Sequence, residues 1–194
     1  MGKEQILEDA IGYVRALYEG NSDGHGLDHT MRVYHLAMKI ADSEPGCDRR
    51  ITALAALLHD ADDPKLFSTE DNRNARSFLA EQGVSPEETE RICAVINSVS
   101  FSKNGGRRLE DINAMIVQDA DRLDAIGAIG IARTFAFGGK HGRGLDSSVQ
   151  HFYDKLLRLK DMMNTEMARE MAEKRHRLMI EFLKEWDTET ETAG

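Results

Sequence analysis

Apolar residues along the chain recur every three or four positions, which is the period of amphipathic α-helices. No segment alternates between apolar and polar residues in the manner of a half-buried strand. The pattern therefore predicts an all-α protein, and one compact domain over residues 1–194 is the simplest division. Helices are expected at about residues 3–19, 28–41, 48–60, 69–82, 86–99, 109–123, 124–136, 147–160 and 163–186.

One of these helices is almost entirely apolar. The run Ile51–Leu58 offers no polar face to water, so it is expected to be buried, and it ends in His59 and Asp60. Placing an imidazole and a carboxylate at the end of a buried helix costs free energy unless something satisfies both groups. A divalent metal ion would do so, because it binds imidazole nitrogen and carboxylate oxygen together. A hydrogen bond between His59 and Asp60 that caps the helix is the alternative at this point.

A second histidine lies on the apolar stripe of its predicted helix. His29 is followed by Val33 at plus four and Ile40 at plus eleven, so its side chain is expected to point toward the core. His25 lies four residues earlier and would share this face if the helix extended back. A histidine in this position is more often a hydrogen-bonded core residue than a metal ligand, and the pattern alone leaves both readings open.

Three carboxylates stand close together in an otherwise apolar region near the middle of the chain. Asp119, Asp121 and Asp124 fall within six residues, and a cation would relieve their mutual repulsion. Asp119 shares a helical stripe with Leu123, whereas Asp121 shares one with Ala125. Periodicity therefore does not choose between them.

In this order, His29, His59-Asp60 and Asp121 resemble the H…HD…D signature of the HD-domain metal-dependent phosphohydrolases. The resemblance implies that His29, His59, Asp60 and Asp121 are the metal ligands, with Asp119 and Asp124 as second choices. A closer resemblance, to small single-domain bacterial HD hydrolases, covers nearly the whole chain. That group includes manganese-dependent nucleoside triphosphate pyrophosphohydrolases. The segments that carry this resemblance are residues 25–29, 58–65, 118–130 and 151–157.

The resemblance implies a single HD domain with a core at about 22–135 and C-terminal helices at about 146–186 packed on it. One divalent ion is expected, with manganese preferred and magnesium, iron, nickel and cobalt as alternatives. The expected reaction is hydrolysis of (deoxy)nucleoside triphosphates to monophosphate and pyrophosphate by metal-activated water. An HD-type nucleotidase (phosphomonoesterase) or phosphodiesterase is the enzymatic alternative, and a nucleotide- or metal-binding sensor is the non-enzymatic one.

Four further residues are assigned roles beside the ligands. Asp63 is expected to act as general base or to position the attacking water. His25 is expected to bind phosphate or assist the leaving group, because histidine changes charge near neutrality. Lys65 and Lys155 are expected to contact substrate phosphate. For each of these residues the alternative is an ordinary surface position.

Composition narrows the range of partners and compartments. The formal charge of −9 and the pI near 5.3 argue against a broad nucleic-acid-binding face, which needs a basic stripe. A small phosphorylated substrate, such as a nucleotide, is the expected partner. No apolar run is long enough for a membrane span, and the start of the chain does not resemble a signal peptide. Because Cys47 and Cys93 form no CxxC pair, a reducing, cytoplasmic location is expected.

Two groups of apolar residues are expected to serve packing rather than chemistry. Phe135, Phe137, Phe152 and Tyr153 stand at helical spacing and are assigned to the core. The methionines between Met162 and Met171 are also expected to pack, with a homodimer interface as one use of them.

Overall fold

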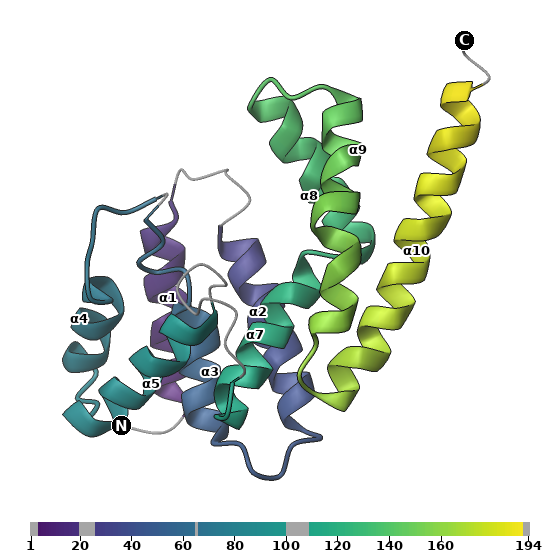
Figure 1. Ribbon diagram of the computed structural model, residues 1–194. Helices are drawn as coiled ribbons and strands as arrows, with labels where there is room; N and C mark the ends of the chain where they lie inside the picture. The colour runs from purple at the N-terminus through teal and green to yellow at the C-terminus, as the bar shows by residue number, and fades with distance from the viewer. Residues whose placement is uncertain (1–3, 20–25, 65, 100–108, 192–194) are drawn as a thin grey trace. The chain divides into compact units, whose positions relative to one another are not determined.

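The computed structural model describes residues 4–19, 26–64, 66–99 and 109–191 (Figure 1). These ranges consist of helices joined by turns and short loops, and they contain no strand, so the predicted all-α fold is confirmed. Within the same ranges, no helix combines the length and the apolar character that crossing a membrane requires.

The chain forms two compact units, Met1–Ala120 and Asp121–Gly194. The division falls inside one continuous helix, α7 (Ile112–Asp124), so Asp121 follows the last residue of the first unit without a break in the helix. The two units are taken in turn below.

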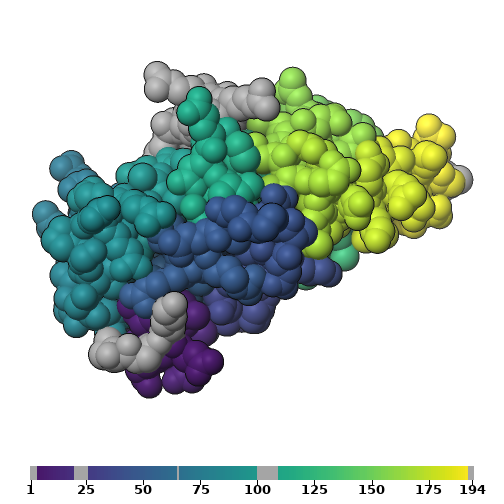
Figure 2. Space-filling view, turned by 90° about the horizontal axis from the view of Figure 1, so that it is seen from below, coloured from purple at the N-terminus to yellow at the C-terminus, as the bar shows by residue number. Residues whose placement is uncertain are grey.

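Helix α3 (Arg49–Leu58) is the centre of the first unit. Every residue from Ile51 to Leu58 is buried, as the apolar run predicts. α3 packs against α1, α2 and α5. Figure 2 shows the atoms of the α2–α3 region (blue) and of the α4–α5 region (teal) as one continuous packed surface. The other helices of this unit are α1 (Gln5–Leu17), α2 (Leu27–Ala41), α4 (Arg73–Glu81), α5 (Pro86–Val99) and the main part of α7.

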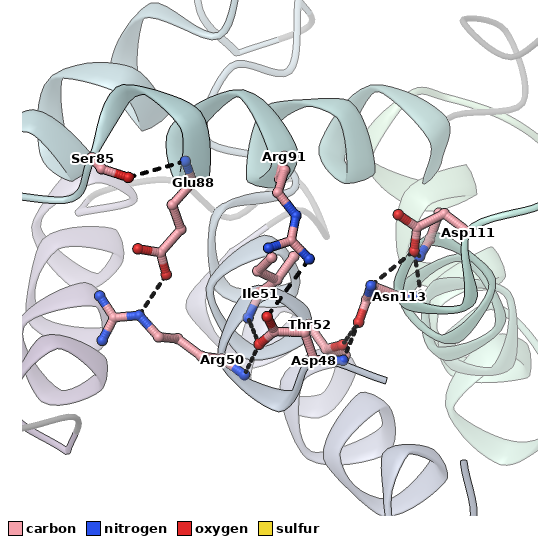
Figure 3. Close-up of polar contacts among 10 residues, drawn as sticks. Asp48, Arg50, Ile51, Thr52, Ser85, Glu88, Arg91, Asp111 and Asn113 are labelled. Carbon is pink, nitrogen blue, oxygen red and sulfur yellow. Dashed lines mark hydrogen bonds and ion pairs between the residues drawn. The ribbon is translucent and has the colours of Figure 1, made fainter. Parts of the chain in front are cut away.

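Polar contacts fix the beginning of α3 (Figure 3). The side chain of Asp48 caps the helix by accepting hydrogen bonds from the backbone N–H groups of Arg50 and Ile51. Arg50 also pairs with Glu88 of α5, with 2.6 Å between Nε and Oε1. The start of α3 is therefore attached to α5, while its buried body runs through the core.

The second unit contains α8 (Gly127–Lys140), α9 (Leu145–Asp154), the 3-10 helix η1 (Leu156–Met162) and α10 (Glu166–Glu191). Its core is built around aromatic rings, with the centroids of Phe135, Phe152 and Phe182 within 6.2 Å of one another. Phe137 and Tyr153 were assigned to the core, and that prediction is wrong. They are 44% and 46% exposed, because the side chains two positions after Phe135 and one position after Phe152 point toward another side of their helices.

The start of α4 and the helix expected at 147–160 are among the places where the helix boundaries differ from the sequence prediction. α4 begins at Arg73 rather than near residue 69, because Asp71 and Asn72 adopt left-handed backbone conformations with φ of 54° and 52°. The helix predicted at 147–160 is two elements, since α9 ends at Asp154 and η1 follows.

Candidate metal centre

His59 continues the end of α3 and is oriented by a backbone contact. Its Nδ1 lies 2.8 Å from the carbonyl oxygen of Ala56. A carbonyl oxygen only accepts, so Nδ1 carries the proton and donates it. In the neutral imidazole the lone pair is then on Nε2, which is the arrangement that second-shell contacts impose on histidines that bind metals.

The other imidazole and a carboxylate converge on this nitrogen. His29 lies in the first turn of α2 and is 2% exposed, and its ring meets that of His59 edge-on with centroids 5.2 Å apart. The two Nε2 atoms are 3.3 Å apart. Oδ2 of Asp60 lies 3.5 Å from Nε2 of His29 and 3.4 Å from Nε2 of His59. Three potential ligand atoms therefore form a triangle with nearly equal sides.

Asp121, in the last turn of α7, completes the group. One potential ligand atom from each of His29, His59 and Asp121 lies within 4.8 Å of the others. Nitrogen and oxygen ligands bind divalent ions at about 2.0 to 2.2 Å, which places neighbouring ligand atoms about 3 to 3.5 Å apart. The distances among the two imidazoles and Asp60 lie at the upper end of this range. His29, His59 and Asp121 therefore form a cluster that could hold a metal ion, and Asp60 lies beside both of its imidazoles.

The alternative of a simple His–Asp cap accounts less well for this geometry. Since Nδ1 of His59 donates to Ala56, its Nε2 presents a lone pair toward Nε2 of His29. A direct hydrogen bond between the rings would satisfy that lone pair, but it would not explain why Oδ2 of Asp60 lies at almost the same distance from both Nε2 atoms. A cation attracts both imidazole lone pairs and the carboxylate at once.

The two acidic residues after Asp60 have different surroundings. Asp62 is buried, and its carboxylate accepts the backbone N–H groups of Asn74 at 2.9 Å and Ala75 at 3.1 Å in the first turn of α4. Asp62 therefore caps α4 from a turn that lies twelve residues before Asn74 in the sequence. Asp63 is half-buried, and its backbone N–H donates to the carbonyl of Asp60 at 3.1 Å.

Two buried hydroxyls near the ligands were not singled out from the sequence. Tyr18 is 4% exposed and Thr30, which follows His29, is 0% exposed, and the two hydroxyls interact with each other. Burial and the negative charge of Asp60 raise the pKa of Tyr18, so its hydroxyl keeps its proton. The sequence signal was present, because Tyr18 follows Val14 by four residues on the buried stripe of α1.

Two carboxylates considered as second-choice ligands are buried residues of α7. Asp124 is 1% exposed and pairs with Arg133, with 2.5 Å between Oδ2 and Nη1. Asp119 is 0% exposed. The ion pair gives Asp124 a structural role that the sequence pattern did not reveal.

Three further residues, His25, Lys65 and Lys155, were predicted to contact the substrate. His25 and Lys65 lie outside the described residues. Lys155 is exposed and follows α9 in the second unit. Burial, together with the charges of Lys155 and Arg143, lowers the pKa of His151.

Comparison with known proteins places this geometry in a family. The sequence profile of the HD domain matches residues 26–126, a range that begins before His29 and ends after Asp121. The chain belongs to the HD-domain family. It is 44% identical over 183 residues to the protein YpgQ of Bacillus subtilis, covering 89% of this chain and 88% of that protein.

Solved structures of HD proteins have the same fold. YpgQ in complex with ADP superposes with a TM-score of 0.81 at 37% identity, covering 94% of this chain and 97% of that one. An HD-superfamily hydrolase from Bacillus thuringiensis superposes with a TM-score of 0.82 at 38% identity, covering 98% and 99%. The chain is thus an HD-superfamily hydrolase, and His29, His59 and Asp121 form a cluster that could hold a metal ion.

Proposed function

We propose that this HD hydrolase binds one divalent ion, preferably manganese, and cleaves (deoxy)nucleoside triphosphates to monophosphate and pyrophosphate. The observation that carries the proposal is the convergence of the His29 and His59 Nε2 atoms and Asp60 Oδ2 at 3.3 to 3.5 Å. With Asp121 added, two nitrogen and two oxygen donors suit manganese, magnesium, iron, nickel or cobalt better than the thiolate sets of structural zinc sites do.

The residues around this centre are proposed to have different roles in the reaction. When bound, the ion polarises a phosphoryl oxygen and lowers the pKa of water, so that a nucleophile is available near neutral pH. Ala56 holds His59 in the tautomer that presents Nε2. Asp63, three residues after Asp60, is proposed to accept the proton of the attacking water. His25, Lys65 and Lys155 are proposed to contact the phosphates.

A nucleotide is the proposed substrate for two reasons. YpgQ, which is related over most of its length, has been solved with ADP. The chain is strongly acidic overall, so an anionic substrate depends on a bound cation and on local basic side chains for its attraction. The phosphate chain of a nucleoside triphosphate is long enough to contact the bound cation and the basic side chains together.

A hydrolysis panel tests the proposal. Manganese-loaded protein is given ribo- and deoxynucleoside tri- and monophosphates, and pyrophosphate is resolved from orthophosphate. His59→Ala is the inactive variant, and His35→Ala, an exposed histidine in α2, is the matched control. We expect pyrophosphate from triphosphates with the wild type and with His35→Ala, and none with His59→Ala.

Other outcomes of the panel would replace the proposal. Orthophosphate released from monophosphates would identify a nucleotidase. Release of neither product by a protein that still binds manganese and nucleotide would favour a sensor.

A further inference from the structure

We infer that Asn113 sets the alignment of α3 and α7, and thereby the distance between the ligand atoms that the two helices carry. This inference rests on the proposed metal centre and assigns a positioning role to a residue far from it. Asn113 is in the first turn of α7 and is 6% exposed (Figure 3). It is separated along α7 from Asp121 by eight residues.

The side-chain oxygen of Asn113 joins the first turns of the two helices. Oδ1 accepts the backbone N–H of Asp48 at 2.7 Å and the hydroxyl of Thr52 at 3.0 Å. Thr52 is 0% exposed, so its hydroxyl depends on a protein partner. Asp48 is the residue that caps α3, so Asn113 binds both the cap and the first full turn of that helix.

Asp111 holds the amide of Asn113 in the required orientation. Its Oδ1 accepts from Nδ2 of Asn113 at 2.9 Å, and from the backbone N–H of Asn113 at 2.7 Å. A carboxylate can only accept, so the amide nitrogen faces Asp111 and the amide oxygen faces α3. Asp111 on α7's side and Asp48 with Thr52 on α3's side therefore fix the orientation of the Asn113 amide between them.

The ligands lie at matching levels beyond this contact. His59 is seven residues after Thr52, and Asp121 is eight residues after Asn113. At 1.5 Å per residue these separations are about 10 and 12 Å, or two turns along each helix. A shift of one helix along the other would move Asp121 relative to His59 by the same amount. The contact at Asn113 resists that shift at one end, and the ligands meet at the other.

The experiment compares variants of the full chain by manganese affinity. Thr52→Val removes only the hydroxyl at constant shape, Asn113→Ala removes both hydrogen bonds, and Thr52→Ser keeps the hydroxyl. Arg50→Met breaks the link from α3 to Glu88 of α5 and is the control for loss of stability without loss of alignment. All variants are measured by titration calorimetry at a temperature at which circular dichroism shows each to be folded.

We expect the dissociation constant for Mn²⁺ to rise at least tenfold in Asn113→Ala and several-fold in Thr52→Val, as is typical when support of a metal site is removed. Thr52→Ser and Arg50→Met should stay within about threefold of the wild type on the same principle. Equal affinity in Asn113→Ala and the wild type, or equal losses in Asn113→Ala and Arg50→Met, would overturn the inference.

A crystal structure of Asn113→Ala separates this inference from the proposed function. We expect the Asp121 carboxylate to move out of the 4.8 Å range that it now shares with the two imidazoles. If the wild type binds no divalent ion, the metal proposal fails and the alignment is judged on this separation. If the wild type binds manganese and the variant keeps the separation, only the role of Asn113 is refuted.

Discussion

Asp62 and Asp63 are adjacent carboxylates with different surroundings, and they should respond differently to the same substitution. Asp63→Asn is expected to lower kcat for triphosphate hydrolysis by about 10²- to 10⁴-fold, the usual contribution of a general base. Its manganese affinity should stay close to that of the wild type, because Asp63 is not one of the proposed ligands. Steady-state kinetics and titration calorimetry on the same preparation check both. Unchanged kcat would remove Asp63 from the reaction.

Asp62→Asn is the matched variant. It keeps the shape of a side chain that accepts two backbone N–H groups of α4 but removes its charge. We expect the free energy of unfolding in urea to fall by about 1 to 2 kcal/mol, because an amide has one acceptor oxygen and leaves one of the two N–H groups without its partner. The value of kcat at low temperature should be nearly unchanged. A loss of kcat equal to that of Asp63→Asn would show that the cap and the reaction are not separate.

His151 is expected to make the free energy of unfolding of the second unit depend on pH. Burial and the charges of Lys155 and Arg143 lower the pKa of His151 below its ordinary value of 6.5. The unfolded chain therefore binds a proton more readily than the folded one, and the free energy of unfolding falls as the pH drops from about 6.5 toward the folded pKa. Above about pH 7 His151 is neutral in both the folded and the unfolded state, so it no longer changes the free energy of unfolding with pH. The effect is moderate, because His151 is only half-buried.

Urea unfolding of the wild type and His151→Gln between pH 5 and 8 measures this effect. The difference between the two stability curves should be flat above pH 7 and should change below pH 6.5, where the wild type loses stability relative to the variant. Parallel curves over the whole range would show that His151 has the same pKa in both states.

At the scale of elements, two glycines are expected to respond in opposite ways to substitution by alanine. One has a backbone conformation that favours glycine, and the other is an ordinary helix position. Gly127 begins α8 with φ of +76°, and a Cβ there would lie 2.9 Å from Cβ of Arg175. Gly127→Ala is therefore expected to cost about 1 to 3 kcal/mol in the free energy of unfolding. Gly12 lies within α1 with open space around it, so Gly12→Ala should add about 0.5 to 1 kcal/mol. Thermal and urea denaturation compare the two. Changes of the same sign would contradict this account.

Helix positions could be predicted from the sequence where the residues that begin or end a helix lie next to it in the chain. Pro86 follows Ser85 at the start of α5, where the Ser85 hydroxyl accepts from the N–H of Glu88, and the predicted bounds of 86–99 match the observed helix. The start of α4 was missed because the left-handed conformations of Asp71 and Asn72 have no comparable signal. The cap that Asp62 supplies to α4 comes from a turn twelve residues earlier, and only the folded chain brings the two together.

At the scale of the molecule, the candidate site combines residues from three separate parts of the sequence. The order His29, His59-Asp60 and Asp121 could be recognised from the sequence because the H…HD…D signature has the same residue types in the same order. Periodicity alone could not separate Asp121 from Asp124, and the pairing of Asp124 with Arg133 supplies a distinction that was absent from the pattern. The contact between Asn113 and Thr52 joins residues 61 positions apart. Thr52 was visible as the one hydroxyl in a buried apolar run, but its partner depends on how the helices pack.

Metal binding should appear as stability of the whole chain, independently of turnover. A ligand that binds only the folded state at 100 times its dissociation constant stabilises by about 2.7 kcal/mol. For a chain of this size, 1 kcal/mol shifts Tm by about 2 to 4 °C, so saturating Mn²⁺ should raise Tm by roughly 5 to 10 °C. His59→Ala should lose most of this shift, because Nε2 of His59 is the nitrogen on which His29 and Asp60 converge. His35→Ala should keep it. Differential scanning fluorimetry with Mn²⁺ and with EDTA measures the shift, and an equal rise in His59→Ala and the wild type would place the ion elsewhere on the chain.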